Sequence, residues 1–141
     1  MEIRTAVESD INQILNLQTQ IYRTDKISPD AQETLKNQLK NESCTVLVLE
    51  ENGKILSTAT VYYIQVAVRA RPYALLEGLV VNDSLRGKGY GTKLFEKCIE
   101  TARLKNCYKM LFTSGSDREE AHKFYEKLGF KKWGLEFRMD L

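Results

Sequence analysis

The sequence predicts a single α/β domain over residues 1–141, in which a mixed sheet is flanked by helices. Three observations lead to this prediction. First, β-branched and apolar runs of strand length alternate with segments whose apolar residues recur at helical spacing. Second, Asn52-Gly53 stands between two such runs and is a strong hairpin signal. Third, no repeat, linker or low-complexity stretch interrupts this order, and 141 residues is an ordinary domain length.

Two helices are expected in the first forty residues, after a short opening strand over residues 2–7. A helix over residues 8–23 takes Ser9 or Asp10 as its N-cap, and a second over 28–41 opens at Ser28. One face of the first helix is apolar and consists of Ile11, Ile14, Leu15, Ile21 and Tyr22.

The middle of the chain is rich in strand signals. Residues 44–50 and 54–68 form the two arms of the hairpin, and the proline within 69–73 predicts a loop after them. Residues 74–82 are apolar on both faces apart from Glu77. This pattern predicts a central strand that is covered on both sides.

The last third of the chain alternates helix and strand. The apolar stripe of residues 92–106 predicts a helix, and residues 108–113 predict a strand. A helix over 116–129 starts at Ser116 or Asp117 and stops at Gly129. The segment 130–141 is expected to close the domain as a strand or hairpin, broken near Gly134.

Composition limits the classes of function. The formal net charge of +2 is too small to indicate a nucleic-acid or membrane-surface partner, and no apolar run is long enough to cross a bilayer. Cys44, Cys98 and Cys107 lack C-x-x-C spacing and His122 is the one histidine, so neither disulfides nor a metal site is expected. The N-terminus lacks a signal-peptide layout, and reduced thiols in the cytoplasm are the expectation.

The stretch "RGKGYGTK", residues 86–93, is the most specific local feature. It fits neither the P-loop nor the dinucleotide fingerprint, because Thr92 stands where each requires a glycine. The shared physics still applies: a strand enters a glycine-rich turn and then a helix whose first amides have no helical partner. With Arg86 and Lys88 beside it, this turn predicts a pyrophosphate site, the alternative being a plain strand-to-helix turn.

Residues 74–130 resemble the Gcn5-related N-acetyltransferases (GNAT). The family signature [QR]-x-x-G-x-[GA] is matched by Arg86, Gly89 and Gly91, and a second family motif, "AHKFYEKLGF", follows at residues 121–130. The resemblance implies a mostly antiparallel central sheet, splayed between the fourth and fifth strands. It also implies acetyl-CoA as co-substrate, with its pyrophosphate in the glycine loop.

The resemblance further implies coenzyme contacts. The main chain of the strand before the loop would hold the pantetheine arm like an added strand, and an amide of Leu79 or Val80 would polarise the acetyl carbonyl. Arg118 replaces an asparagine of many relatives, and an arginine can reach a phosphate instead. The implied coenzyme-binding positions are Leu79, Val80, Val81, Arg86, Gly87, Lys88, Gly89, Tyr90, Gly91, Thr92, Arg118 and Phe124.

Two residues are candidates for proton transfer. Tyr125 occupies the motif position where many members of the family keep a general acid for the leaving thiolate, although it also fits an apolar packing stripe. Glu77 is the one charge in an apolar strand, which suits a base acting directly or through water, or a structural carboxylate. No cysteine follows the motif of an activated nucleophile, so direct transfer in a ternary complex is expected.

The expected acceptor is the primary amine of a small molecule. Segments 22–32, 68–73 and 133–139 are its expected surroundings, with Arg69 and Arg71 available for a phosphate or carboxylate. Two alternatives stay open: a protein acceptor, at a lysine or an N-terminus, and a non-catalytic acetyl-CoA sensor. Family members are often dimers, so a homodimer is compatible with the resemblance, although no sequence feature requires one.

Overall fold

The computed structural model describes residues 1–141. The chain divides into two compact units, Met1–Leu111 and Phe112–Leu141. The first unit holds all the strands and three of the α-helices, and the second holds one α-helix. One domain over residues 1–141 stays a prediction.

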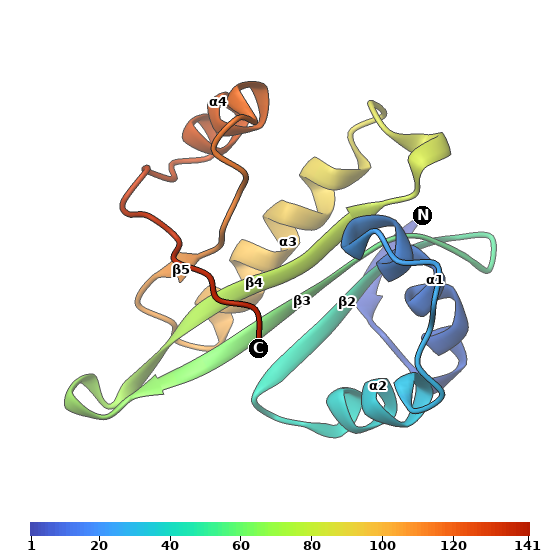
Figure 1. Ribbon diagram of the computed structural model, residues 1–141. Coiled ribbons are helices and arrows are strands. Elements are labelled where there is room, and N and C mark those ends of the chain that lie inside the picture. The colour runs from blue at the N-terminus through green and yellow to red at the C-terminus, as the bar shows by residue number, and fades with distance from the viewer. The chain divides into compact units, whose positions relative to one another are not determined.

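The sheet of the first unit has five strands in the order β1-β2-β3-β4-β5 (Figure 1). Neighbouring strands are antiparallel except for β4 and β5, which run parallel. The predicted mixed, mostly antiparallel sheet is therefore confirmed. The strands are β1 Glu2–Thr5, β2 Cys44–Glu51, β3 Lys54–Val66, β4 Arg71–Val81 and β5 Met110–Leu111.

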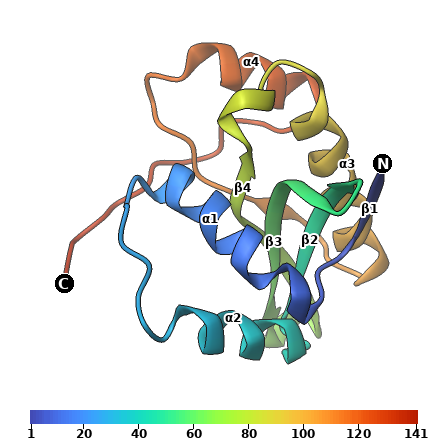
Figure 2. The same ribbon diagram turned by 90° about the vertical axis from the view of Figure 1, so that its right-hand side faces the viewer.

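Helices cover both faces of this sheet. Helices α1 (Ile11–Tyr22) and α2 (Ala31–Lys40) lie on one face, and α3 (Tyr90–Leu104) lies on the other, as Figure 2 shows. Short 3-10 turns occur at Glu8–Asp10, Ala67–Arg69 and Asp83–Leu85. None of the helices combines the length and apolar character that crossing a membrane requires.

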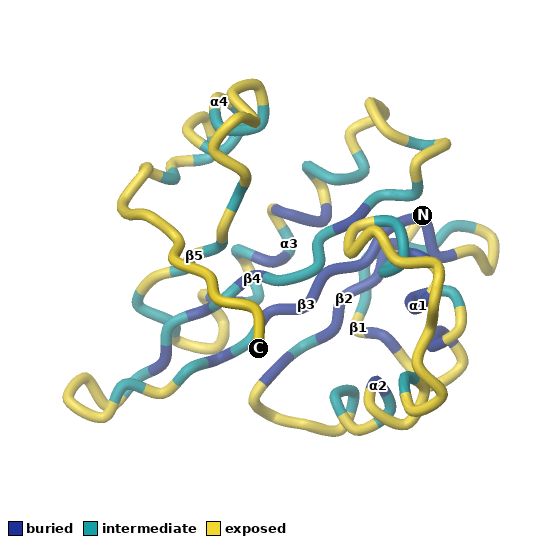
Figure 3. Tube along the Cα trace, in the orientation of Figure 1, coloured by how far each residue is buried: buried dark blue, intermediate teal, exposed yellow.

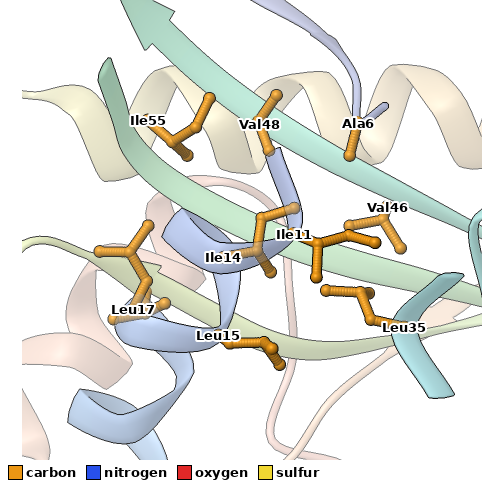
Figure 4. Packing of buried hydrophobic residues seen from close by; sticks show 10 residues of the cluster. Ala6, Ile11, Ile14, Leu15, Leu17, Leu35, Val46, Val48 and Ile55 are labelled. Atoms are coloured by element: carbon orange, nitrogen blue, oxygen red, sulfur yellow. The ribbon is translucent and has the colours of Figure 1, made fainter. Parts of the chain in front are cut away.

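The hydrophobic core lies between the strands and their helices, where Figure 3 shows the buried residues. On one face, Ile14 of α1 and Leu35 of α2 pack with Val46 and Val48 of β2 (Figure 4). On the other face, α3 buries one stripe, because apolar residues at three- and four-residue spacing line one side of a helix. That stripe consists of Leu94, Phe95, Cys98 and Ala102.

Asp10 is the N-cap of α1, as predicted, but its carboxylate does not cap the helix. Instead Oδ2 accepts a hydrogen bond from Val7 N–H at 2.8 Å, and both carboxylate oxygens pair with the Arg4 guanidinium at 2.7 and 3.0 Å. The hydrogen bond from Arg4 is the largest cause that lowers the pKa of Asp10. Asp10 thus fastens the start of α1 to β1.

The apolar face of α1 differs from the prediction at its end. Ile21 is 37% exposed and Tyr22 is 55% exposed, so both leave the core, while Leu17 is buried. Helices α2 and α4 (Glu119–Lys127) begin three residues after their predicted starts, whereas α3 begins at Tyr90, two residues before its predicted start. Helix α2 begins at Ala31 and α4 begins after Arg118, with no side-chain cap on either.

Both hairpins of the sheet are short. Asn52 and Gly53 have φ values of 53° and 77°, which the predicted two-residue turn requires. The prediction of a loop over 69–73 is partly wrong, because Pro72 lies in β4 opposite Gln65. Proline is tolerated there, near the start of the strand, where its carbonyl still accepts a hydrogen bond from Tyr108 N–H at 3.0 Å.

The predicted closing strand is wrong for this structure. Residues 130–141 form no strand, and β5 contains two residues instead of the predicted six-residue strand over 108–113. Alternating apolar residues define a strand's two faces, but a strand also needs a neighbour that takes its N–H and C=O groups. None of the five strands of the sheet includes residues 130–141.

Candidate functional site

Strand β4 has an open edge over its second half. Its parallel neighbour β5 pairs with Ala74 and Leu75 only. From Leu76 to Val81 no strand lies on that side of β4, so the predicted splay between the fourth and fifth strands is confirmed. The main chain of Leu79 to Val81, the expected pantetheine contact, belongs to this open half.

A β-bulge interrupts β4 within the same half. Thr60 pairs with Glu77 and Thr58 with Val80, so Gly78 and Leu79 together lie opposite one residue of β3. Gly78 has a φ of +64°, a conformation that glycine adopts without strain. A bulge locally disrupts the ladder hydrogen bonds and redirects the backbone. The amides expected to polarise an acyl carbonyl therefore lie in or next to an irregular part of the strand.

The Glu77 carboxylate, just before the bulge, contacts the last residue of α1. The Tyr22 hydroxyl donates a hydrogen bond to Glu77 Oε2 at 3.4 Å. A Cβ added to Gly78 would lie 3.4 Å from the same hydroxyl oxygen. Burial is the largest cause that raises the pKa of Tyr22, followed by the negative charge of Glu77. Tyr22 therefore stays a neutral hydrogen-bond donor over the physiological pH range.

The negative charge of Glu77 also affects the pKa of a second phenol, Tyr62. Burial raises the pKa of Tyr62, and the charges of Cys44 and Glu77 raise it further. Its hydroxyl accepts a hydrogen bond from Gln38 Nε2 at 2.7 Å. The sequence places Tyr22 on the apolar helix face and at the start of the segment 22–32 expected around the acceptor, but it does not predict the contact with Glu77, and it assigns no role to Tyr62. The available signal for Tyr22 was a polar-tipped side chain in the last helical turn, beside a connector expected to face a ligand.

The segment between β4 and the glycines is held from two sides. The side chain of Asn82 accepts a hydrogen bond from Ser84 N–H at 3.1 Å, and Gln20 Oε1 of α1 accepts one from Asp83 N–H at 3.0 Å. Gly87 and Gly89 follow, with φ values of +80° and +83°. Both glycines thus adopt the left-handed conformation, which a glycine reaches without strain.

Helix α3 begins without a side-chain cap, because its N-cap residue is Gly89. The hydrogen bond from Lys93 N–H to the Gly89 carbonyl, at 3.2 Å, closes the first turn. The N–H groups of Tyr90, Gly91 and Thr92 precede that bond and have no helical partner. Aligned amides at a helix N-terminus favour an anion, so this turn fits a phosphate group.

Glycine is required in this turn for two different reasons. A Cβ at Gly87 or Gly89 would meet no atom within 4 Å, so the backbone conformation, and not packing, requires glycine there. A Cβ at Gly91 would lie 3.3 Å from Val81 Cγ2, so this glycine lets α3 approach β4 closely. The space beside Gly87 and Gly89 is open to a ligand.

Two cations flank the turn. Arg86 forms an ion pair with Asp83 at 2.5 Å, and their side chains are 62% and 63% exposed. Exposed ion pairs contribute about 0–1 kcal/mol, so Arg86 can exchange Asp83 for a phosphate at little cost. Lys88 is also exposed. The positions expected to bind the coenzyme, 79–81 and 86–92, thus follow one another along β4 and the start of α3.

In the second unit, α4 ends at the predicted glycine. Gly129 has a φ of +100°, and its N–H donates to the Glu126 carbonyl at 3.0 Å. The N–H of Phe130 donates to the Tyr125 carbonyl at 3.1 Å. These two bonds form a Schellman motif, and the sequence "KLGF" is therefore the end signal of this helix.

Tyr125 belongs to an aromatic cluster of the second unit. Its ring meets the Phe112 ring edge to face, with centroids 4.6 Å apart, and Phe112 contacts Phe130 in the same way at 5.1 Å. Phe124 and His122 lie at centroid distances of 5.7 and 6.4 Å from Tyr125. The ring of Tyr125 therefore packs, as one interpretation of the sequence expected, and the role of its hydroxyl stays a prediction.

Arg118 and the two arginines of the β3–β4 hairpin differ in their freedom to bind a ligand. Arg118 is the exposed N-cap residue of α4. Arg71 donates hydrogen bonds to the carbonyls of Asn106 and Cys107 at 3.0 and 3.3 Å, so its guanidinium is already engaged by the protein's own backbone. The guanidinium of Arg69 lies 4.4 Å from the centre of the Tyr108 ring.

The three thiols are poor nucleophiles. Burial raises the pKa of Cys44 and Cys107, and it raises the pKa of Cys98 to about 12. A raised pKa disfavours the thiolate, which is the reactive form of cysteine. No group of three or more His, Cys, Asp and Glu side chains that could hold a metal ion is found in the structure.

Residues 11–130 match the model of the acetyltransferase (GNAT) family. The chain is 28% identical over 144 residues to glucosamine 6-phosphate N-acetyltransferase of Trypanosoma brucei brucei, covering 100% of this chain and 96% of the relative. It is 32% identical over 113 residues to glucosamine 6-phosphate N-acetyltransferase 1 of Dictyostelium discoideum, covering 74% and 68% of the two chains. A solved structure from Agrobacterium tumefaciens str. C58 superimposes with a TM-score of 0.90 at 31% identity, over 100% of both chains.

Proposed function

Because this chain belongs to the acetyltransferase (GNAT) family and is an N-acetyltransferase, we propose that it transfers an acetyl group from acetyl-CoA to the primary amine of a small molecule. One observation carries the proposal. Strand β4 leads from the Glu77 carboxylate, through the bulge at Gly78, into the uncapped N-terminus of α3. A proton acceptor, redirected amides and an anion site thus follow one another within sixteen residues, 77–92.

The residues of the first unit fit acetyl-CoA, which supplies an activated thioester when bound. The free amides of Tyr90 to Thr92, with Arg86 and Lys88, are suited to its pyrophosphate. The open edge of β4 over Leu79 to Val81 is suited to an extended amide chain, which can bind like an added strand. Gly89 keeps the backbone turn that aligns these amides.

Glu77 is the proposed base of the reaction. An amine attacks an acyl group only in its neutral form, so a group must take its proton before or during attack. The carboxylate is partly exposed, and the Tyr22 hydroxyl orients one of its oxygens. Glu77 takes the amine proton directly or through a water molecule.

Tyr125 is the proposed acid. The leaving thiolate needs a proton, and a phenol with a reference pKa near 10 can share one with a thiol at short range. Arg118 and Phe124 are proposed coenzyme contacts from the second unit, as the family resemblance implies. The raised pKa values of all three thiols support direct transfer to the amine without an acyl-enzyme.

An amino sugar phosphate is the first acceptor to test, because two relatives are named as glucosamine 6-phosphate N-acetyltransferases. The experiment measures acetyl-CoA-dependent thiol release with glucosamine 6-phosphate, polyamines, aminoalkylphosphonates, aminoglycosides and lysine peptides. Release with one small-amine class supports the proposal. Release with lysine peptides alone would identify a protein acceptor and overturn it.

A Glu77→Gln variant tests the base in the same assay. We expect kcat to fall by about 10²-fold near pH 7, in the range that general-base catalysis contributes. The loss should shrink as the pH rises, because more of the amine is then neutral without help from the enzyme. A variant with the parent's kcat at every pH would remove Glu77 from the mechanism. Retention of the rise in Tm with acetyl-CoA shows that the coenzyme still binds.

A further inference from the structure

Two segments that meet at one end of the sheet carry basic residues and no acidic ones. They are residues 61–76, which include the β3–β4 hairpin, and residues 101–111, which run from the last turn of α3 into β5. Together they hold five of the 21 basic residues of the chain and none of the 19 acidic ones. The rest of the chain is therefore net negative, and the positive charge at this end of the sheet is local.

Backbone hydrogen bonds bring these two segments together. The N–H of Tyr108 donates to the Pro72 carbonyl at 3.0 Å, and the N–H of Ala74 donates to the Lys109 carbonyl at 2.9 Å. The guanidinium of Arg71 bonds to two carbonyls just before Tyr108. Carbonyl oxygens satisfy its N–H groups but do not neutralise its charge, so Arg71 adds to the positive potential here.

Tyrosine rings lie against the other cations. The Arg69 guanidinium lies 4.4 Å from the centre of the Tyr108 ring. The Lys109 ammonium lies 5.1 Å from the centre of the Tyr73 ring and 5.5 Å from that of Tyr108. A cation over an aromatic face is attracted by the ring and keeps its full charge. These rings therefore hold long, flexible cations in place without cancelling them.

No carboxylate pairs with these cations. The Lys105 ammonium likewise lies over a ring, 5.7 Å from the centre of Tyr63. The segment before β2, on the other side of β3, adds one charge of each sign, Lys40 and Glu42. No ion pair of the structure includes any of the four cations that we name the basic surface: Arg69, Arg71, Lys105 and Lys109.

The basic surface lies far from the glycine turn. Figure 1 shows the β3–β4 hairpin at one end of β4 and the glycine turn at the other. Arg71 and Glu77 are six residues apart along β4, which is about 20 Å of extended chain. A small amine whose nitrogen is at Glu77 does not span this distance. The proposed acetyl transfer therefore leaves the basic surface without a role.

We propose that the basic surface binds an acidic segment of a partner protein, in which an apolar residue stands among several Asp or Glu side chains. Cations gathered without an acid repel one another, and a partner with several carboxylates replaces this repulsion by attraction. Because the tyrosine rings already restrict Arg69, Lys105 and Lys109, less side-chain entropy is lost on binding.

Two observations favour a protein segment over a nucleic acid. Surfaces that bind single-stranded nucleic acid offer open aromatic faces on which bases stack, whereas cations already lie over the rings of Tyr73 and Tyr108. In addition, Val68, in the turn of the hairpin beside Arg69, is 93% exposed. An apolar side chain next to cations complements a segment that carries both an apolar residue and carboxylates.

The experiment measures the binding of a short fluorescein-labelled peptide, in which one leucine stands within a run of glutamates, by fluorescence anisotropy. We expect its Kd to rise at least about threefold when the ionic strength increases from ~0.01 M to ~0.15 M, because the screening length falls from about 30 Å to about 8 Å. A uridylate oligonucleotide of equal charge and vesicles containing phosphatidylserine are the competing probes. Tighter binding of either one, or no binding of the peptide, would overturn the proposal.

Neutral variants test whether binding depends on this surface. Lys105→Gln combined with Lys109→Gln should raise the Kd of the peptide by about tenfold. Lys36→Gln combined with Lys54→Gln is the matched control, because it changes the net charge equally on α2 and at the start of β3 and should leave Kd within about twofold of the parent. Equal effects of the two pairs would mean that only net charge matters and would overturn the proposal.

The binding assay contains no acetyl-CoA, so its result is independent of the proposed acetyl transfer. Circular dichroism checks that each variant folds.

Val68→Ser tests the apolar contact. We expect an approximately threefold rise in Kd for the leucine peptide and no change for a peptide in which glutamine replaces the leucine. The high exposure of Val68 makes this change compatible with the fold. If the variant binds both peptides as tightly as the parent does, the argument for a protein partner fails and the proposal is overturned.

Discussion

The Tyr22 hydroxyl donates a hydrogen bond to Glu77 Oε2 across 55 residues of sequence. This contact joins the end of α1 to the strand position just before the β4 bulge. The carboxylate therefore has a neighbour that fixes the orientation of one oxygen. If Glu77 takes a proton from the acceptor amine, Tyr22 is a positioning residue for that step.

Replacing Tyr22 by Phe removes this hydrogen bond and keeps the ring. The bond is long and partly exposed, so we expect kcat to fall only about threefold to tenfold, which corresponds to the roughly 0.5–1.5 kcal/mol that an ordinary hydrogen bond contributes. The KM for acetyl-CoA should not change, and steady-state kinetics measures both. Tyr62→Phe is the matched control, because the Tyr62 hydroxyl bonds to Gln38 and not to Glu77. Equal losses in the two variants would mean that Tyr22 has no special role.

Tyr125→Phe separates chemistry from packing. The variant keeps the edge-to-face contact with Phe112, so Tm should change little, while kcat should fall about tenfold or more, over 1.4 kcal/mol of barrier. Tyr125→Leu is the opposite case, and we expect it to lower stability by about 1 kcal/mol through loss of the aromatic pair. Full activity in the Phe variant would leave Tyr125 with its packing role alone.

Gly89→Val should abolish the stabilisation by acetyl-CoA. Valine at a φ of +83° strains the turn by roughly 1–3 kcal/mol and moves the amides that face the ligand. Gly53→Val is a matched control, because Gly53 has a φ of +77°, equally open surroundings and a position in the β2–β3 hairpin. Thermal unfolding with and without acetyl-CoA measures the difference. If Gly89→Val keeps the parent's shift in Tm, the glycine turn does not bind the coenzyme.

Asp10→Asn should weaken the fold and change its response to acid. Arg4 and the Val7 amide lower the pKa of Asp10 in the folded chain, so an unfolded chain binds the proton first as pH falls. Asp10 thus stabilises the fold above pH about 3.8, its ordinary pKa, and this stability is lost as pH falls through the lower folded value.

Denaturant unfolding from pH 7 to pH 2 tests this expectation. We expect the variant to lose about 2–3 kcal/mol at pH 7, because it leaves Arg4 with fewer charged partners, and to show a flatter decline in acid. Glu8→Gln is the control, since Glu8 is an exposed partner of Lys36 and its pair should contribute almost nothing. A parent and an Asp10 variant with parallel acid profiles would contradict the assignment.

Local patterns were enough to predict the helices and most strands. The Asn52-Gly53 turn, the stripe of α3 and the stop at Gly129 each depend on residues within a few positions of one another. The glycine turn was predictable for the same reason, because a strand, a turn and an uncapped helix are consecutive in sequence. The cap at Asp10 was predicted at the right residue, but its partner Arg4 comes from another element.

The remaining features depend on contacts between distant segments. Tyr22 fits the helical period of the core residues, yet it faces Glu77, and the period contains no information about that partner. The residue type of Pro72 predicts a loop, whereas its pairing with Gln65 places it near the start of β4. The alternation of residues 133–141 defines two faces without saying which strand lies beside them.

The two-residue pairing of β4 with β5 has a consequence for folding order. Strands β2, β3 and β4 are joined by short hairpins and have low contact order, whereas the β4–β5 pairing must wait for the whole α3 crossover to close. We expect the β2–β3–β4 meander to form first and the β4–β5 pair to open most easily in the native state. Amides at Ala74 and Met110 should then exchange with solvent faster than those in the middle of β3. If acetyl-CoA binds along the open edge of β4, as proposed, its addition should slow the exchange of these amides.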